Sequence, residues 1–498
     1  MADKNNSLES IEIRFASGAF QDDDTTQLLG VHGREEISRL YTFDFVFSRQ
    51  KAYTSDEIDQ LLKAPCALTL GPKTGDVVHG LMSHIEAVDH ERHNVPRYVA
   101  RLVPNLWLLT LTKASRVFLG MTVPKIVTTL LQDFYQLGEA NFHITNRNTK
   151  KSPEHDYVAQ YQESDWDFIQ RRLEHEGFFY WFEHGDADKL IISDDNTTAS
   201  DIEDDAISYR ERNNLSSGRQ ATIWDWNVTQ QRIPARVTLL DYNYNTPNTR
   251  LLAPAVIDAS RGFGTQVDWG YDFKDNDVGA ELAKIWAEQA RCQRYIVKAT
   301  TDCSRFRVGH SFELENHYDS AYDGEYLITK IDHRVGYELL PDGERINDLP
   351  QRYFARFEAI PMDVPFRPER RTPWPRISGV THGTIDGDTN GDYAQLDSEG
   401  RYIVSMPFDC RLNKNGKASH PIRMAQPYAG AAYGHHNPLH KGTEVLIAHE
   451  NGDPDRPVIV GSVPNPRTKS PSTSVNATQS VTQTASGIRL ELEDLQNS

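Results

Sequence analysis

The stretch "SDWDFIQRRLEHEGFFYWFEH", residues 164–184, joins a helix signal directly to one of the most aromatic runs in the chain. The first half predicts a helix, because Ser164 or Asp165 can cap it and apolar residues recur at helical spacing. Gly177 ends that helix. The residues that would share its apolar side are Trp166, Ile169 and Leu173, with Phe168 beside them.

The run from 178 to 182 is entirely aromatic and predicts a strand that is apolar on both faces. Side chains alternate along a strand, so Phe178, Tyr180 and Phe182 face one way and Phe179 and Trp181 face the other. Both faces must then be covered. We therefore predict a central strand, a contact in a trimer, or both.

The histidines of this stretch do not form the helix of a zinc hydrolase. The H-E-x-x-H motif places its second histidine four residues after the first, so that both rings share one face. His175 is followed at that position by Phe179, and Gly177 ends the helix between them. His184 lies beyond this break. We interpret the stretch as core packing rather than a catalytic or metal site.

Length and composition indicate a large protein of roughly three domains, with 498 residues of which 38% are hydrophobic. Apolar runs such as "LWLLTL" (106–111) are far shorter than the roughly 20 residues of a membrane-spanning helix. The N-terminus "MADKNNSLES" shows no secretory signal, so we expect assembly in the cytoplasm and any export without a cleaved signal peptide. A net charge of −18 argues against a nucleic-acid partner.

Four scattered cysteines form no CxxC pair: Cys66, Cys292, Cys303 and Cys410. A hairpin could bring Cys292 and Cys303 together. Reduced, buried thiols are nevertheless the prediction for a protein made in the cytoplasm.

Strand patterns flank a shorter region of mixed helix and strand. "YTFDFVF" (41–47) and "GEYLITKIDHRVGYE" (324–338) alternate as strands do, and "LPDGER" (340–345) predicts a hairpin tip. Helices are expected at 122–137, with Thr122 as cap and Gly138 as stop, and at about 276–291. "PNLWLLTLTKASRVF" fits either a strand or a helix. The expected parts are a first β region (1–121), an inserted α+β subdomain (122–204), a second β region (205–360), a proline-rich linker (361–376), a barrel (377–464) and a polar tail (465–498).

The region 377–464 fits a compact barrel of oligonucleotide/oligosaccharide-binding (OB) topology. "GTEVLIAHENGDPDRPVIVGSV" predicts a hairpin that turns at Asn451-Gly452 and Asp453-Pro454. Beyond 464 the chain is rich in serine and threonine until "IRLELEDL", an alternating strand with no partner nearby, which favours pairing with other chains. Before that hairpin, "DSEGRYIVSMPF" turns at 397–400 and then places on one face Tyr402, Val404 and Met406.

Several segments in this order resemble the VgrG family, the trimeric spike proteins of type VI secretion, which are related to phage tail hub and needle proteins. The resemblance spans roughly residues 10–495. The segments that carry it are "GREEISRLYTFDF" (33–45), "LVPNLWLLTLTKASRVF" (102–118), "QYQESDWDFIQRRLEHEGFFYWFEH" (160–184), "PWPRISG" (373–379), "RMAQPYAG" (423–430) and "KGTEVLIAHENGDPDRPVIVGSVPNP" (441–466).

The resemblance implies a mainly β fold with two hub β-barrels (within 1–121 and 205–360), the inserted α+β part, an OB-type barrel and the start of a trimeric β-helix needle (465–498). It also implies a homotrimer with a hexameric Hcp-like tube protein at the base, a PAAR-type protein at the tip, and carried effectors. Relatives usually continue into needle repeats, whereas this chain stops at Ser498. We expect either a truncated chain or a short needle, and no appended effector domain.

Two groups of residues are of the kinds that bind metal ions. His435, His436 and His440 lie around Asn437-Pro438, which disfavours a helix that would align them, so we predict exposed or interface histidines. The acidic residues at 450, 453 and 455 lack the terminal ligand of a calcium loop, which favours a structural turn. The sequence contains no G-x-S-x-G elbow, Walker A loop or G-x-G-x-x-G motif. We predict no catalytic residues, cofactor or metal.

The function these features favour is a non-enzymatic membrane-puncturing spike of a contractile injection machine, which contacts target membranes transiently and leaves the cell by injection. A tail hub of a phage or of an extracellular injection system is the main alternative. A cell-wall hydrolase is disfavoured, because no spacing in the chain identifies the facing pair of carboxylates that a glycosidase needs.

Overall fold

The computed structural model describes residues 15–17, 26–71, 77–88, 95–147, 152–202, 206–210, 221–336, 353–388, 391–411 and 413–495. The hairpin tip expected at 340–345 lies outside them. The structure is mainly β, as predicted, and divides into two compact units. Unit 1 contains Met1–Thr112, Thr122–Pro153 and Asp165–Pro373, and unit 2 contains Lys113–Met121, Glu154–Ser164 and Trp374–Ser498.

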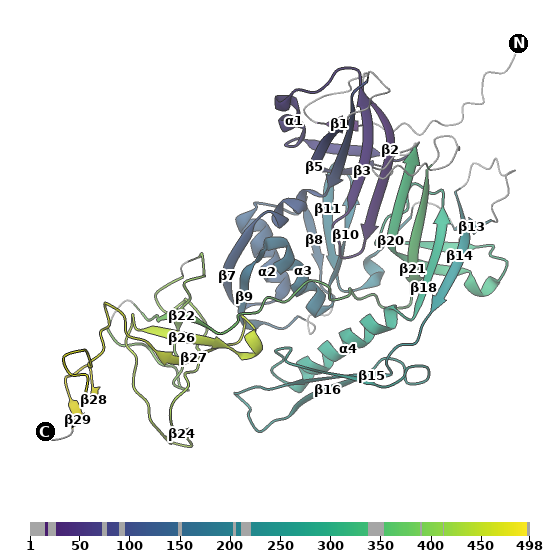
Figure 1. Cartoon of the computed structure of the whole chain (residues 1–498). Coiled ribbons are helices and arrows are strands. Elements are labelled where there is room, and N and C mark those ends of the chain that lie inside the picture. Colours follow the sequence, from purple (N-terminus) through teal and green to yellow (C-terminus); the bar gives the residue numbers. More distant parts are fainter. Residues whose placement is uncertain are drawn as a thin grey trace, which may run out of the picture. The chain divides into compact units, whose positions relative to one another are not determined.

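Unit 1 is built on one sheet of thirteen strands, six of which close into a barrel. Strand β20 (Gly324–Gly336) pairs with β21 on one edge, and on its other edge first with β19 and then with β2. The barrel therefore consists of β20, β21, β18, β14, β13 and β19, and the strands from β2 to β1 extend the same sheet (Figure 1). In sheet order the strands are β1 (Phe15–Ser17), β4 (Pro65–Thr69), β5 (Val77–Val88), β6 (Arg97–Val103), β3 (Thr42–Arg49), β2 (Thr26–Glu36), β20, β21 (Phe354–Pro361), β18 (Tyr295–Thr301), β14 (Thr222–Gln230), β13 (Ile207–Tyr209), β19 (His310–Glu315) and β12 (Ser200–Asp201).

The alternation predicted along these strands is confirmed. Phe43, Phe45 and Phe47 of β3 are each 1% exposed or less, while the residues at 42, 44 and 46 are only partly buried. Strand β20 covers the stretch "GEYLITKIDHRVG" as expected. One face of each strand therefore supplies the core of unit 1.

The stretch at 164–184 folds into the predicted helix and strand, α3 (Asp165–Glu176) and β10 (Phe179–His184). Gly177 between them has a left-handed φ of 73°. The prediction of a central strand is wrong, because β10 lies at the edge of a three-stranded sheet in the order β10, β11 (Asp188–Ser193), β8 (Phe142–Thr145). At the free edge of β10, the Ser38 N–H donates to the Tyr180 carbonyl at 2.8 Å. One turn therefore satisfies a backbone group that a neighbouring strand would otherwise bond.

Both faces of β10 are covered within the same chain. The ring of Tyr180 meets Trp166 of α3 edge-to-face at 5.4 Å, and Phe182 meets Tyr41 at 5.1 Å. All five aromatic residues from 178 to 182 are at most 3% exposed. A trimer contact is therefore not required to bury them, and that part of the prediction is wrong. Burial of each ring contributes about 1.5–3 kcal/mol to folding.

Three further helices lie in unit 1, and two of them were predicted. Helix α2 (Val123–Thr129) begins at Thr122, whose hydroxyl accepts the Lys125 N–H, and continues as a π-helical turn to Phe134. It ends before the expected stop at Gly138, because Gln136 already adopts a left-handed φ of 56°. Helix α4 (Asn276–Cys292) lies along β15 (Arg236–Asp241) and β16 (Leu251–Val256), which form a small sheet with β17 (Thr265–Trp269) (Figure 1). The helix not predicted is α1 (Ser55–Leu61).

The segment that fitted either strand or helix forms both. Residues Asn105–Thr110 make a 3₁₀ helix, and Lys113–Met121 form strand β7, which pairs with β9 (His155–Ser164). These two strands belong to unit 2, although unit 1 residues flank them in the sequence. Val117 of β7 and Tyr157 of β9 pack together, with Phe408 of the C-terminal region against them.

The remainder of unit 2 contains a four-stranded sheet in the order β23 (Val404–Ser405), β22 (Val380–Ile385), β26 (Glu444–His449), β27 (Pro457–Ser462). Its β26–β27 hairpin turns through Asn451 and Gly452, with φ of 52° and 71°, as predicted. The prediction that Tyr402, Val404 and Met406 share one face is also confirmed, because all three are at most 2% exposed and belong to one core. That core consists of Ile385, Tyr402, Val404, Met406, Ile422, Val445, Ile447 and Ile459.

The C-terminal strand was predicted to lack a partner, and this is wrong. Strand β29 (Arg489–Glu493) pairs antiparallel with β28 (Gln479–Gln483), so that Leu490 lies opposite Thr482. Strand β28 can pair with β29 although its side chains are mostly polar, because strands pair through their backbone N–H and carbonyl groups. A two-stranded hairpin by itself is only marginally stable in water.

The four cysteines are unpaired thiols. Cys66, Cys292 and Cys303 are buried, as predicted, whereas Cys410 is exposed. Burial raises the pKa of the Cys66 thiol to about 12, which keeps this sulfur in its unreactive protonated form.

Gly309 provides a test of the packing around β10. Its φ is 77°, and a Cβ atom there would lie 2.4 Å from Cγ of Trp181. We expect Gly309→Ala to lower the free energy of unfolding by about 2–4 kcal/mol, from backbone strain and overpacking. Gly185→Ala is the control, because no atom lies within 4 Å of its Cβ position. Urea unfolding measures both variants, and equal stabilities would contradict the packing described here.

Candidate functional site

The histidines at 435, 436 and 440 take separate partners in unit 2. His436 Nε2 lies 3.4 Å from the Tyr402 hydroxyl, and the ring of His440 lies against Tyr393 with centroids 4.6 Å apart. His435 is exposed. In the part of the chain that the structure describes, no group of three or more histidine, cysteine or acidic residues is placed to hold a metal ion. Their role at an interface stays a prediction.

The acidic residues of the 450–456 turn bond to groups of unit 2. Asp453 Oδ1 accepts the Trp374 indole N–H and the Asp455 N–H, each at 3.1 Å. Asp455 Oδ1 accepts the Ala159 N–H at 2.6 Å, and Glu450 forms ion pairs with two arginines. These contacts link the turn to β9 and to the start of unit 2's C-terminal segment, which is what a structural turn requires.

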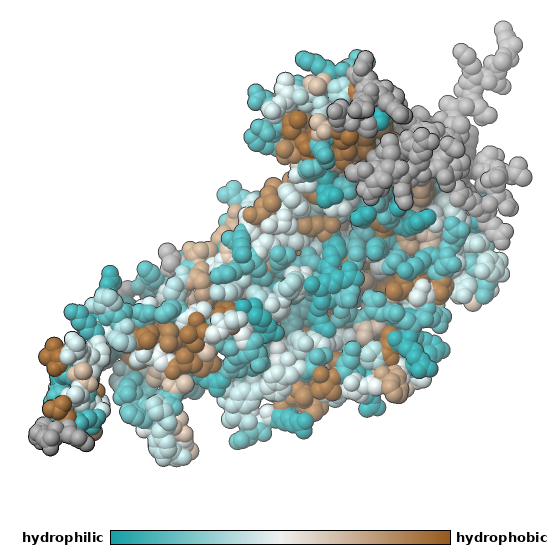
Figure 2. Space-filling model, in the orientation of Figure 1, coloured by the Kyte–Doolittle hydropathy of each residue, from teal (hydrophilic) through white to brown (hydrophobic). Residues whose placement is uncertain are grey.

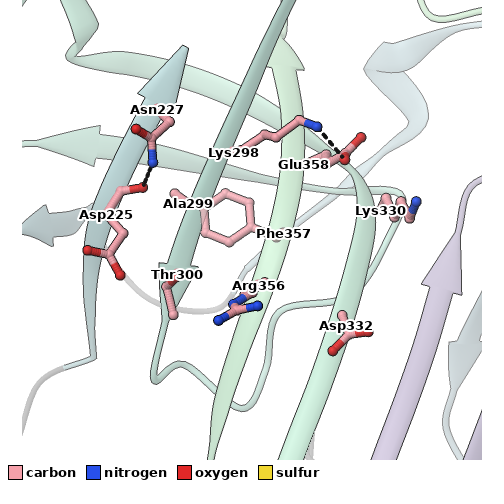
Figure 3. A pocket seen from close by; sticks show the side chains of 10 residues that line it. All are labelled: Asp225, Asn227, Lys298, Ala299, Thr300, Lys330, Asp332, Arg356, Phe357 and Glu358. Carbon is pink, nitrogen blue, oxygen red and sulfur yellow. Dashed lines mark hydrogen bonds and ion pairs between the residues drawn. The ribbon is translucent and has the colours of Figure 1, made fainter. Parts of the chain in front are cut away.

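A polar cavity of about 460 Å³ lies on the outer face of the barrel, across β14, β18, β21 and β20 (Figure 3). Lys298 Nζ lies 3.3 Å from Glu358 Oε1 on the neighbouring strand. Asp225 occupies a bulge with a φ of 54°, and its carbonyl accepts a hydrogen bond from the Asn227 amide at 2.8 Å. The other charged residues of the lining are Lys330, Asp332 and Arg356.

Cations and anions alternate across this surface. Arg356 is the cross-strand neighbour of Asp332, and Lys330 is the neighbour of Glu358. Burial alone would raise the pKa of Asp332, but hydrogen bonds from His32 and Arg334 outweigh it and lower that pKa to about 2. A surface of mixed sign suits ion pairs with another protein rather than a polyanion.

A second polar cluster is sealed inside unit 1. His333 Nε2 donates to Glu35 Oε1 at 2.8 Å, and the Tyr353 hydroxyl lies 2.7 Å from His333 Nδ1. The Arg307 guanidinium is 3.7 Å from the same carboxylate oxygen. All four residues are at most 4% exposed, so a substrate cannot reach this hydrogen-bonded chain. Its role is to hold β2, β20 and the loop before β19 together.

Burial raises the pKa of Glu35, but the hydrogen bond from His333 and the Arg307 charge outweigh it and bring that pKa down to about 2. Burial, with Arg307 nearby, lowers the pKa of His184 to about 3, and burial also lowers the pKa of His333. The cluster therefore combines an ionised carboxylate with neutral imidazoles. The local sequence gives no sign of this cluster, because Glu35 and His333 meet only through the pairing of β2 with β20.

The C-terminal hairpin presents an uncovered apolar edge. Ile488, Leu490 and Leu492 alternate along β29 and are 72%, 61% and 58% exposed, and Leu495 beyond them is 56% exposed. Figure 2 shows this apolar surface over β28 and β29, at the lower left. Leaving such side chains in water is unfavourable by about 25 cal/mol per Å² of apolar area. Exposed apolar side chains of this kind are typical of a surface that another chain covers.

Two family models match the chain. The family described as "Phage tail baseplate hub (GPD)" matches residues 34–338, and the "Type VI secretion system/phage-baseplate injector OB domain" matches residues 397–463. The first match covers most of unit 1, and the second covers the four-stranded sheet of unit 2 except β22.

Curated relatives are similar over most of the chain. The type VI secretion system spike proteins VgrG1a and VgrG1c of Pseudomonas aeruginosa are each 27% identical over 92% of the chain, which spans 70% and 63% of their lengths. The actin cross-linking toxin VgrG1 of Vibrio cholerae is 27% identical over 88% of the chain, which spans 40% of that protein.

Solved structures share the fold. The E. coli c3393 protein, described as a component of the type VI secretion system with similarity to the T4 phage tail proteins gp27 and gp5, aligns with a TM-score of 0.64 and 21% identity. That alignment covers 90% of this chain and 100% of the other. A Francisella PdpA–VgrG complex aligns with a TM-score of 0.59 and 10% identity, over 94% of this chain and 72% of the other.

The buried histidines predict that unit 1 loses stability in acid. A histidine held neutral in the fold takes up a proton on unfolding below its ordinary pKa of about 6.5, so its burial costs stability progressively from pH 6.5 down to its folded pKa. For His184 that window runs down to about 3. Glu35 acts in the same direction, because the stability that it contributes above pH 4.5 is lost between 4.5 and about 2.

We expect His184→Gln to reduce the slope of unfolding free energy against pH by about 1.4 kcal/mol per unit below pH 6. His143→Gln is the control, because that histidine is exposed. Urea unfolding from pH 5 to 7.5 measures both slopes. A wild-type slope in the His184 variant would contradict this account of the cluster.

Proposed function

The chain belongs to the phage tail baseplate hub family, and from that membership we propose that it is the spike of a type VI secretion machine. In this role a homotrimer rides on the end of a hexameric Hcp-like tube and is driven through a target membrane. It is assembled in the cytoplasm and then secreted by injection. Among the described residues, no helix is long and apolar enough to cross a membrane.

The proposal of a trimer rests mainly on the exposed apolar side chains that alternate along β29. In a trimer, each copy would cover the exposed apolar side chains of the others. Strands from several chains can in this way bury apolar faces that a single chain leaves in water. Winding three such strands together would begin a rigid needle, and the hairpin of a single chain has only two strands. Mutual burial also resists local unfolding when the needle is pushed.

Unit 1 is proposed as the base of the spike. Its barrel and the extension of the same sheet would present two β modules per copy, and three copies would form a pseudo-six-fold ring that fits a hexameric tube. The mixed-sign surface of Figure 3 suits such a polar protein contact. A PAAR-type protein would cap the tip. Effectors or their adaptors are proposed as cargo, supported by the fold shared with the Francisella PdpA–VgrG complex.

We propose no catalytic activity for this chain. Its relatives carry names of spike and hub proteins, and the toxin among them is a longer protein of which the chain spans 40%. The sealed Glu35–His333–Tyr353 cluster has no access for a substrate. A cell-wall hydrolase therefore has no observation in its favour.

If the protein is a trimer, light scattering at micromolar concentration should give a mass of three times 56.6 kDa, about 170 kDa. We expect Leu490→Ser with Leu492→Ser to weaken association at least tenfold, because apolar burial at the shared edge is lost. Glu491→Ser is the matched control on the opposite face of β29. A folded wild-type monomer at this concentration would overturn the proposal.

The alternative is the hub of a phage tail or of an extracellular injection system, which the description of the matching family favours. The two functions differ in the tube that the base contacts. We expect the purified chain to retain a hexameric Hcp-like protein and not a phage tail tube protein in co-purification. Retention of the phage protein alone would favour the alternative.

Charge reversal at Lys298 should weaken retention of the tube protein if the surface of Figure 3 is the contact.

A further inference from the structure

Residues 362–372 connect β21 to the start of unit 2's C-terminal segment at Trp374 and form neither helix nor strand. The five prolines of 361–376 predicted a stiff linker. In the structure, residues from three other parts of unit 1 also bond to this segment. We call residues 362–372 the tether.

Asn196 holds the first part of the tether. Its amide Nδ2 donates to the carbonyls of Met362 at 3.3 Å and Val364 at 2.7 Å, and its Oδ1 accepts the Phe366 N–H at 2.8 Å. Asn196 is 6% exposed and begins a 3₁₀ turn capped by Asp195. One buried amide thus bonds the backbone of three tether residues, as a neighbouring strand would.

Arg367 holds the middle of the tether. Its Nε donates to Glu288 Oε2 of α4 at 2.7 Å, and its Nη1 donates to the carbonyls of Asp194 at 2.7 Å and Gly177 at 3.3 Å. The side chains of Arg367 and Glu288 are 4% and 7% exposed, so this is a buried ion pair. A Cβ atom on Gly177 would lie 3.0 Å from Cδ of Arg367, which makes a glycine there necessary for room as well as for its φ.

Glu174 holds the end of the tether. Its carboxylate accepts the N–H groups of Arg371 and Thr372 at 3.1 and 3.0 Å and the Thr372 hydroxyl at 2.9 Å. It also accepts Arg39 Nη1 at 2.8 Å and Gln170 Nε2 at 3.1 Å, and its side chain is 2% exposed. All five donors bond to carboxylate oxygens, and an amide in place of Glu174 would turn an NH₂ group toward some of them.

The tether is not enclosed on all sides. A cavity of about 500 Å³ runs beside it, lined in part by Arg147, Asp195, Met362 and Asp363, and the side chains of Asp363 and Pro365 are exposed. On this side the hydrogen bonds of Asn196, Arg367 and Glu174 hold the tether. Those bonds converge from α3, from α4 and from the turn at 194–197.

We infer that residues 362–372 are a mechanical tether that transfers force between the base and the C-terminal unit without lengthening. This rests on the proposed spike function, which makes such a force necessary. A free chain of eleven residues extends to about 40 Å under load. With the tether bonded to the hub, a push or pull on the C-terminal unit loads several hydrogen bonds and one buried ion pair together.

Hydrogen exchange of the purified full chain tests the bonding directly. In the wild type we expect slow exchange at the amides of Phe366, Arg371 and Thr372, although they lie outside any helix or strand. Asn196→Ala and Glu174→Gln should each raise exchange in 362–372 about tenfold or more. Asn227→Ala, on the barrel surface away from the tether, should leave it unchanged.

Exchange of the tether amides in the wild type at the rate of an unprotected chain would overturn the inference. So would an Asn196→Ala variant whose tether stays protected. If Glu174→Gln accelerates exchange throughout unit 1, the Asn196 variant alone decides, because among the described residues the Asn196 side chain bonds to the tether alone.

Pulling experiments test the mechanical role, with handles in unit 1 and at the C-terminus. The wild type should resist extension between the units, and in both variants the tether should extend at lower force, to at most its full length of about 40 Å. If the wild type and the variants extended at equal force, the inference of a mechanical tether would be overturned. Neither experiment requires the tube or a target membrane, so failure of the tether is separable from failure of the spike function, which light scattering and co-purification test.

Discussion

Unit 1 depends on the burial of an aromatic strand that has no sheet neighbour on one edge. Trp166 of α3 and Tyr41 cover the face that carries Tyr180 and Phe182. Phe366 packs on the other face, against Phe179, and all of these contacts lie within a single chain. This arrangement requires α3, the turn at Ser38 and the tether to converge on β10. Unit 1 therefore covers this strand with residues of its own chain.

The C-terminal hairpin shows the opposite distribution of apolar side chains. Its leucines and isoleucine are more than half exposed, and a two-stranded hairpin offers them no second layer. Unit 1 therefore buries its own apolar side chains, whereas the C-terminal hairpin leaves several of them exposed. In the proposed trimer, other copies would cover these exposed side chains.

The chain passes between the two units several times. Strands β7 and β9 leave unit 1 to pack with residues near Phe408 in unit 2, and the tether holds the last crossing to the hub. Several crossings distribute force over separate covalent connections. A single flexible linker between independent domains would concentrate it on one.

The sequence by itself determined the elements whose signals are local: the helices beginning near Thr122, Asp165 and Asp275, the alternating strands, and the Asn451-Gly452 turn. Motif order also identified the family. Only the tertiary structure decided that β10 is an edge strand, that β29 has a partner in its own chain, and that residues 362–372 are bonded in place. It also brought Glu35 to His333 and Glu174 to Thr372, contacts between residues hundreds of positions apart. Periodicity and capping act over a few residues, whereas these contacts arise from packing between distant segments, which leaves no pattern in the local sequence.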